Sequence, residues 1–204
     1  MVMRFEEIKQ KLRNKTVGIA GAGGLGSNCA VALVRSGVGR LIIADFDVVS
    51  AGNLNRQCFF RDQIGMKKVK AMKMNLMRID PSIPVEAMDV FLNAGNIPEI
   101  FRSCDVIVEA FDLAEMKQMI IETVLAEMPH IPLIAGIGLA GWGDTESIGV
   151  KRDGNLYICG DGRSEAGEEH PPLAPRVGIV ANMQANLALE ILLGKYTKDE
   201  DNTQ

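Results

Sequence analysis

The chain reads Thr16-Val-Gly-Ile-Ala-Gly21-Ala-Gly23-Gly24-Leu25-Gly26-Ser27 close to its N-terminus. The apolar run 16–20 is typical of a buried strand, and the apolar spacing over 25–36 predicts a helix directly after the glycines. A second apolar run, 40–44, then predicts a second strand. Strand, glycine turn, helix and strand form a βαβ unit, whose crossover we expect to be right-handed. This unit places the chain in the α/β class.

Outside this unit the alternation of strands and helices continues. We expect further strands over 84–88, 104–109 and 132–138, and helices over 3–13, 67–78, 97–102, 113–127 and 176–193. Two short segments, 147–151 and 156–159, flank Asp153-Gly154, which indicates an antiparallel hairpin. The remaining segments are expected to be a loop with one helical turn (50–61), a mobile loop (160–172) and a frayed tail (198–204). The predicted fold is a Rossmann-like, doubly wound, mainly parallel sheet with an antiparallel C-terminal hairpin extension.

The length and composition fit one nucleotide-binding domain over 1–204. We divide it into a Rossmann-like core, 1–140, and a hairpin and C-terminal helix, 141–196, to which the family resemblance described below assigns the docking of a protein substrate. The chain has 47% hydrophobic and 24% charged residues and a net charge of −4. That balance argues against a nucleic-acid binder, which usually carries a basic surplus. No apolar run is long enough to span a bilayer, so we expect no membrane association.

The cysteines indicate the compartment. The four of them form no C-x-x-C pair, so neither a zinc ribbon nor a disulfide framework is expected. The first fifteen residues are too charged for a signal peptide. We therefore predict a cytoplasmic protein that binds no zinc.

The glycine turn is a candidate phosphate site. Gly21, Gly23 and Gly26 match the dinucleotide fingerprint, and Gly24 lies between them. Glycines let the backbone approach a phosphate, and the helix that follows points its free N–H groups at it. Asp45, at the end of the second strand, can accept hydrogen bonds from ribose hydroxyls. By itself this pattern favours NAD, and it also fits a turn that only packs helix on strand.

The residues after Asp45 argue for a triphosphate. Arg56 and Lys68 follow in a segment that also holds Asp47 and Asn53. When a nucleophile attacks the α-phosphorus of ATP, negative charge grows on the leaving pyrophosphate, and cations aimed there stabilise the transition state. Asn53 can donate to a phosphate oxygen. The alternative is that Arg56 pairs with a surface carboxylate and Lys68 belongs to a solvated helix end.

Asp112 directly follows the fourth predicted strand. At the carboxyl edge of an open α/β sheet, its carboxylate could hold Mg²⁺ that bridges the nucleotide phosphates. An aspartate at this place also serves well as the N-cap of helix 113–127. The two roles do not exclude each other, and both remain open.

Together these motifs resemble the ThiF/MoeB family, the bacterial relatives of ubiquitin-activating enzymes. The resemblance runs over most of the chain, roughly residues 14–195, and rests on six segments. They are Gly21-Ala-Gly-Gly-Leu-Gly26, Asp45-Phe-Asp47, Asn53-Leu-Asn-Arg-Gln57, Gly65-Met-Lys-Lys68-Val69, Asp112 and Ala174-Pro-Arg-Val-Gly178. The short length resembles the compact thiamine-pathway subgroup, which activates the sulfur carrier ThiS.

The resemblance implies an enzyme that uses ATP and Mg²⁺ to adenylylate the C-terminal glycine of a ubiquitin-like sulfur carrier ending in Gly-Gly, with release of pyrophosphate. Gly24 and Asp45 would hold the nucleotide, Asn53, Arg56 and Lys68 would contact phosphates, and Asp112 would place the metal. Family analogy also implies a homodimer. Two alternatives stay open, an activator of a molybdopterin-pathway carrier and an NAD-dependent oxidoreductase.

Two further residues invite a chemical role. Cys159 lies near the region where some members of that family use a loop cysteine in sulfur transfer, although a half-buried strand position is the simpler interpretation. His170 falls in the loop 160–172 before two prolines, where we expect an exposed side chain with no catalytic part.

Overall fold

The computed structural model describes residues 3–195. Its α-helices are α1 (Phe5–Leu12), α2 (Gly24–Arg35), α3 (Lys68–Met77), α4 (Ile97–Phe101), α5 (Ala114–Glu127) and α6 (Ala174–Leu192). Its strands are β1 (Thr16–Ala20), β2 (Arg40–Ala44), β3 (Val85–Met88), β4 (Val106–Glu109), β5 (Leu133–Gly136), β6 (Gly149–Asp153) and β7 (Leu156–Gly160). Three 3₁₀ turns, Ala51–Asn53, Arg61–Gln63 and Thr145–Ser147, lie in the connecting loops.

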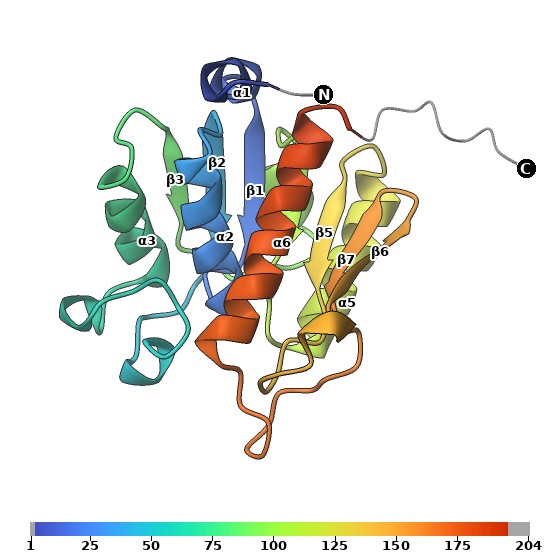
Figure 1. The fold of residues 1–204 in the computed structure, drawn as a ribbon. Coiled ribbons are helices and arrows are strands. Elements are labelled where there is room, and N and C mark those ends of the chain that lie inside the picture. Colours follow the sequence, from blue (N-terminus) through green and yellow to red (C-terminus); the bar gives the residue numbers. More distant parts are fainter. Residues whose placement is uncertain (1–2, 196–204) are drawn as a thin grey trace, which may run out of the picture.

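All seven strands form one sheet in the order β3-β2-β1-β4-β5-β7-β6 (Figure 1). Only the β6–β7 pair is antiparallel. The chain leaves β1 toward β2 and β3 and then returns to the other side of β1 with β4. The sheet therefore has a topological switch point between β1 and β4, where open α/β sheets bind ligands beyond the carboxyl ends of the strands. The predicted fold class is confirmed.

Helices cover both faces of the sheet (Figure 1). One buried cluster contains residues of β1, α2, α3 and α6, and a second contains residues of α4 and α5 with the opposite face of the strands. Both faces of β1, β4 and β5 are buried, which explains their unbroken apolar sequences. α6 lies against α2, so the last helix packs on the first crossover helix.

The predicted strands and helices are all present, with bounds that differ by at most two residues. The hairpin turns at Gly154-Asn155, where Gly154 has a φ of +56°. The structure excludes the alternative of an N-cap role for Asp112. α5 begins at Ala114 after Leu113, and no side chain caps its first turn, so Asp112 is not the N-cap. The loop 160–172 has no helix of its own, and the predicted tail 198–204 lies outside the described residues.

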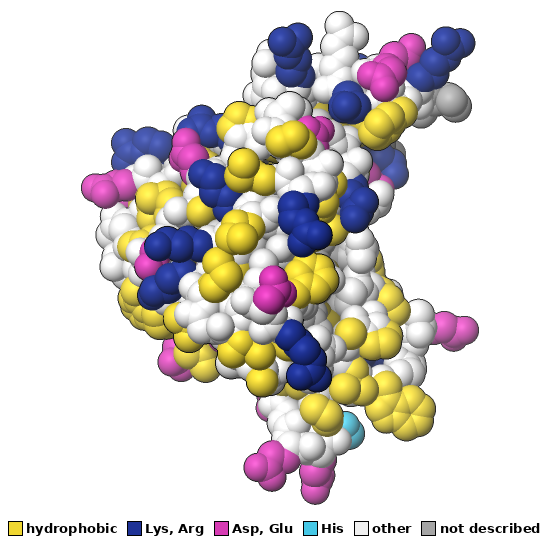
Figure 2. Space-filling view, turned by 90° about the vertical axis from the view of Figure 1, so that its left-hand side faces the viewer, with side chains coloured by type: hydrophobic (Ala, Val, Ile, Leu, Met, Phe, Trp, Pro, Cys, Tyr) yellow, Lys and Arg dark blue, Asp and Glu magenta, His cyan; other side chains and the backbone are white. Residues whose placement is uncertain are grey.

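The surface is unevenly charged. Figure 2 faces the edge of the molecule formed by β3 and α3, where Lys and Arg side chains lie among exposed hydrophobic ones. Acidic side chains project at the lower end of this view. Within residues 3–195 no helix is long and apolar enough to cross a bilayer.

Candidate nucleotide site

A pocket of about 710 Å³ opens at the switch point between β1 and β4. Gly21, Gly23 and Gly24 form part of its wall. A Cβ on Gly21 would lie 2.9 Å from the carbonyl oxygen of Ala110, and the φ of Gly21 is +100°, so only glycine suits this turn. A Cβ on Gly23 would meet nothing closer than 3.9 Å. The open space beside the N-terminus of α2 fits a phosphate group.

Asp45 follows β2 and lines the same pocket. Its Oδ2 accepts a hydrogen bond from the N–H of Ala22 at 2.7 Å, and its Oδ1 accepts one from the N–H of Asp47 at 2.8 Å. Burial raises the pKa of the Asp45 carboxyl, while the Ala22 N–H and the nearby Lys68 ammonium lower it. Each carboxylate oxygen keeps a further lone pair, so Asp45 can still accept a bond from a ribose hydroxyl.

Lys68 is a wall residue of the pocket and is not part of a solvated helix end. Its side chain is 7% exposed, and its Nζ lies 2.7 Å from Oδ2 of Asp47. Asp47 also lines the pocket and is half exposed. The carboxylate holds the ammonium at the beginning of α3 with one strong contact. Two of the three N–H donors of Lys68 have no contact with a described side chain, so they can bind an anion.

Arg56 lines the pocket beside Gly24. Its Nη1 donates to the carbonyl of Gly52 at 3.3 Å and to Oδ1 of Asn55 at 2.9 Å. Among the described residues it forms no ion pair, so the alternative of a surface carboxylate partner has no support. Its remaining guanidinium donors are available to a ligand.

Gln57 and Asn53 differ in their access to this pocket. Gln57 is 8% exposed and lines the pocket, and its Oε1 has no hydrogen-bond partner among the described residues. Asn53 is not one of the residues that line the pocket. Its Oδ1 accepts a bond from the N–H of Ser50 at 2.9 Å, which closes the short 3₁₀ turn. Its predicted phosphate contact stays a prediction.

Asp112 lies in the wall of the pocket on the far side of the switch point. Within residues 3–195 no group of three or more His, Cys, Asp or Glu side chains could hold a metal alone. Mg²⁺ usually takes one or two carboxylates and completes its shell with waters and substrate phosphates. A single exposed carboxylate in a phosphate pocket fits that mode, and the metal role of Asp112 stays a prediction.

The pocket also holds a buried ion pair that we did not predict. Glu109, the last residue of β4, is fully buried, and its Oε1 lies 2.9 Å from the Nζ of Lys117 on α5. Lys117 also donates to the carbonyl of Gly136 at 2.8 Å, and it lines the pocket. Burial raises the pKa of Glu109, and Lys117 opposes that rise. The pair fixes α5, and with it Asp112, to the ends of β4 and β5.

One end of the pocket is apolar. Phe46 and Phe91 form an edge-to-face pair with ring centroids 5.0 Å apart. Both line the pocket, together with Val90, Leu92, Leu113 and Met116. This end suits the base of a nucleotide because it offers aromatic and aliphatic surface beside Asp45. In the sequence, the only indication of this apolar end was Phe46, which stands between Asp45 and Asp47.

The cysteines and His170 lie outside the pocket lining. Cys159 faces the core on β7 and is fully buried, so the expected half-buried position was wrong. Burial raises the pKa of its thiol to about 12, which leaves no thiolate near neutral pH. Cys29 is also buried in the core. His170 is exposed, as predicted.

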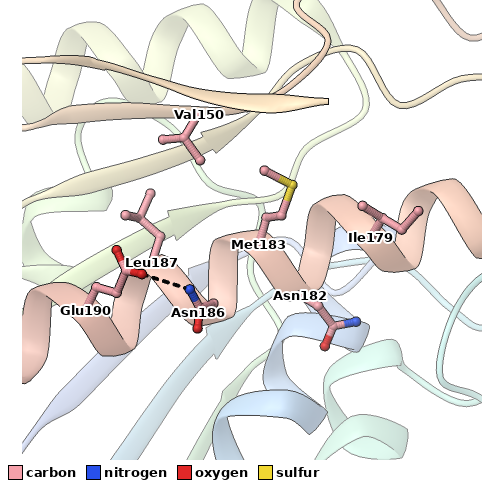
Figure 3. A pocket seen from close by; sticks show the side chains of 7 residues that line it. All are labelled: Val150, Ile179, Asn182, Met183, Asn186, Leu187 and Glu190. Carbon is pink, nitrogen blue, oxygen red and sulfur yellow. Dashed lines mark hydrogen bonds between the residues drawn. The ribbon is translucent and has the colours of Figure 1, made fainter. Parts of the chain in front are cut away.

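A second hollow lies between α6 and β6 (Figure 3). Val150, Met183 and Leu187 point into it, and Asn186 donates to Glu190 at 3.1 Å along its floor. It measures about 440 Å³ and has neither a glycine turn nor a cation. Of these two hollows in the described part of the chain, only the pocket at the switch point combines a glycine turn with cations.

The fold and this pocket define a Rossmann-like nucleotide-binding protein with a phosphate cradle at α2. Its family is shown by sequence: the model of the ThiF family matches residues 2–204, and the chain belongs to that family. The resemblance to the ThiF/MoeB proteins is thus confirmed.

Two relatives are yeast proteins named adenylyltransferase and sulfurtransferase UBA4. The one from Eremothecium gossypii is 32% identical over 92% of this chain and 43% of its own length. The one from Scheffersomyces stipitis is 26% identical over 98% of this chain and 46% of its own length. The chain therefore spans less than half the length of these relatives.

Solved structures share the fold. The Escherichia coli tRNA N6-threonylcarbamoyladenosine dehydratase TcdA in complex with ATP aligns with a TM-score of 0.85 at 20% identity, over 95% of this chain and 92% of that one. Escherichia coli MccB with AMPCPP and MccA aligns with a TM-score of 0.72 at 23% identity, over 95% and 60%.

Proposed function

We propose that this protein adenylylates the C-terminal glycine of a small ubiquitin-like sulfur carrier that ends in Gly-Gly. An oxygen of the carrier's terminal carboxylate attacks the α-phosphorus of ATP, the bond between that phosphorus and the bridging oxygen breaks, and pyrophosphate leaves. The carboxylate is already ionised at neutral pH, so no general base is needed. Catalysis then consists of positioning and of charge neutralisation.

The observation that carries this proposal is the convergence of Arg56, Lys68 and Asp112 on one pocket with the glycine turn. In the proposed complex the α2 end and Gly21, Gly23 and Gly24 cradle phosphates, and Asp45 binds the ribose. Arg56 and Lys68 neutralise the leaving pyrophosphate. Asp112 holds Mg²⁺, which when bound neutralises phosphate charge. Asp47 orients Lys68, and Asn53 is a further candidate phosphate donor.

The finer assignments are part of the same proposal. We propose a ThiS-like carrier in thiazole formation for thiamine, in the cytoplasm, with the protein as a homodimer. The MccB structure contains MccA, so a protein with this fold can bind a partner other than a ThiS-like carrier. From the family resemblance, a carrier of the molybdopterin pathway is the main competitor.

An isotope-exchange assay tests the proposal. Purified protein with Mg²⁺–ATP should return labelled pyrophosphate to ATP only when a Gly-Gly carrier is present, and mass spectrometry should detect the carrier–AMP anhydride. Carriers of the thiamine and molybdopterin type compete in parallel reactions. Trp142 is the chain's only tryptophan and is 85% exposed, so its emission gives a second readout of docking. Absence of exchange with every Gly-Gly carrier would contradict the proposal.

The alternative of an NAD-dependent oxidoreductase is weaker. Neither histidine of the chain lies in the described lining of the pocket, so no histidine is placed there to relay a proton. That alternative requires tight NADH binding with enhanced nicotinamide fluorescence, and our proposal requires its absence.

A further inference from the structure

Two loops and the first turn of α6 meet beyond the carboxyl ends of β5 and β7, at the bottom of Figure 1. The first loop follows β5, and the second follows β7. The N–H of Gly141 donates to the carbonyl of Pro171 at 3.1 Å, and the N–H of Ala140 donates to the hydroxyl of Ser164 at 3.2 Å. Asp45 follows β2, on the other side of the switch point from β5 and β7. Residues of both loops line the pocket on the β5 and β7 side. They are Gly138, Leu139, Ala140, Ser164, Glu165, Ala166 and Pro172.

Arg176 joins these three segments from the third residue of α6. Its side chain is 6% exposed, and its Nη2 lies 2.5 Å from Oδ2 of Asp161 in the second loop. Its Nη1 donates to the carbonyl of Gly143 in the first loop, and its Nη2 lies 3.4 Å from the hydroxyl of Ser147. One guanidinium therefore holds both loops to the beginning of the helix. The next residue, Val177, lines the pocket.

Asp161 is built into the second loop. Its side chain is 2% exposed, and its Oδ1 accepts hydrogen bonds from the N–H groups of Arg163 and Ser164, each at 2.8 Å. A Cβ at position 138 would lie 2.0 Å from that Oδ1, and Gly138 has a φ of +79°. Glycine at 138 therefore makes room for the carboxylate. Burial works to raise the pKa of Asp161, but the hydrogen bonds from Ser164, Arg163 and Arg176 hold it below its usual range.

The location of the Arg176–Asp161 ion pair does not favour the stability of the fold. A cation in the first turn of a helix opposes the helix dipole. Both charges also lose their hydration, and buried ion pairs often stabilise less than apolar side chains of the same volume. The Nε of Arg176 has no hydrogen-bond partner among the described residues. What the pair does supply is a fixed geometry for two pocket-lining loops.

Resting on the proposed adenylyl transfer, we propose that Arg176 and Asp161 are a positioning pair that shapes the part of the pocket receiving the carrier's C-terminal tail. The nucleotide end is built by other elements, namely the turn after β1, the end of β2 and the segment 56–68. The attacking carboxylate must approach the α-phosphorus at near van der Waals distance, and small displacements of the wall that guides it reduce productive binding. The pair therefore acts on the acyl substrate and not on ATP.

Arg176→Lys tests this inference, because lysine keeps the charge and loses the fork that spans both loops. The matched control is Arg163→Gln, which removes an exposed ion pair with Asp144 from the same loops. In pyrophosphate exchange, Arg176→Lys should raise the KM for the carrier about tenfold or more and leave the KM for ATP within about twofold. Arg163→Gln should change neither. Equal shifts of both KM values, or no shift of either, would overturn the proposal.

Two further measurements keep the test decisive. If Arg176→Lys fails to fold, the double variant Asp161→Asn with Arg176→Gln removes both charges and leaves no buried charge alone, and the same split of KM values is expected. Amide hydrogen exchange of Arg176→Lys should be faster in 138–147 and 160–173 and unchanged in β1 and α2. Unchanged amide hydrogen exchange in the loops would refute the positioning role of the pair, whatever the acyl substrate is. Absence of pyrophosphate exchange by the wild type with every carrier would refute only the proposed function.

Discussion

At the scale of single residues, the pocket combines side chains whose partners on the protein leave them available to a ligand. Among the described residues, the guanidinium of Arg56 donates only to neighbouring loop atoms, and Lys68 is held by one carboxylate. Both residues line the pocket, and both follow β2 in the sequence. Their contacts with phosphate stay a prediction. Lys117 and Gln57 were harder to assign. Lys117 enters the site only because α5 packs on β4 and β5, and nothing in its local sequence records that contact.

Replacing Arg56 with alanine tests the role of its guanidinium. Arg56→Ala should reduce pyrophosphate exchange about a hundredfold or more, because a preorganised cation that meets growing charge contributes on that scale. The drop should appear in kcat more than in the KM for ATP. The control is Arg61→Ala, an exposed residue outside the pocket lining. Near-wild-type exchange by Arg56→Ala would remove this residue from the mechanism.

Lys67 and Lys68 are neighbours in the sequence, but we expect their replacement by methionine to affect pyrophosphate exchange differently. Lys68→Met should fold, since its partner Asp47 is 48% exposed and stays hydrated when the ammonium is lost. We expect exchange to fall about a hundredfold, since the lost charge faces the pocket. Lys67 and its partner Asp89 are not among the residues that line the pocket. Lys67→Met removes this ion pair and a contact to the backbone carbonyl of Phe46, and should leave the rate within about threefold. Similar rates for both variants would contradict our assignment of Lys68.

At the scale of elements, apolar runs and turn residues predicted the strands and helices, because buried parallel strands are apolar on both faces. The start of α5 was predicted within one residue, but the N-cap role considered for Asp112 was wrong for a local reason. An aspartate before a helical pattern favours an N-cap, but Leu113 is extended and the helix begins only after it. Asp112 is thereby left outside the helix and in the wall of the pocket. The preference of aspartate for the N-cap position is not realised here, because the chain is still extended after β4.

Two glycines in helices have opposite expected effects on stability. In α2, a Cβ on Gly26 would lie 1.9 Å from the carbonyl oxygen of Gly21, so Gly26→Ala should lower the free energy of unfolding by about 3 kcal/mol or more. In α6, a Cβ on Gly178 would meet nothing within 4 Å. Gly178→Ala should therefore raise the free energy of unfolding by about 0.5–1 kcal/mol, because alanine favours the helix more than glycine does. Urea unfolding followed by circular dichroism measures both, and equal effects would contradict this account of the β1–α2 turn.

At the scale of the whole molecule, the pocket is assembled from distant parts of the chain. The glycine turn lies near residue 21, Lys68 at the beginning of α3, Asp112 before α5, and Val177 on α6. α6 crosses the sheet and packs on α2, and this brings the first turn of α6 to the glycine turn. The sequence predicted the helix but not this contact, because a periodic apolar pattern does not specify which surface it covers. The positioning pair of Arg176 and Asp161 was not predicted, for the same reason.

Because ligand and fold share these elements, the nucleotide that the pocket prefers should stabilise the whole chain. A ligand at a hundred times its Kd adds about 2.7 kcal/mol to the free energy of unfolding. For a chain of this size that raises the Tm by roughly 5–10 °C. We expect Mg²⁺–ATP to produce this shift in scanning calorimetry and NADH at equal concentration to produce none. Lys68→Met should retain its own Tm without ligand and lose most of the shift with ATP. A larger shift with NADH would reverse the choice between the two functions, because the same glycine turn and Asp45 could then serve a dinucleotide.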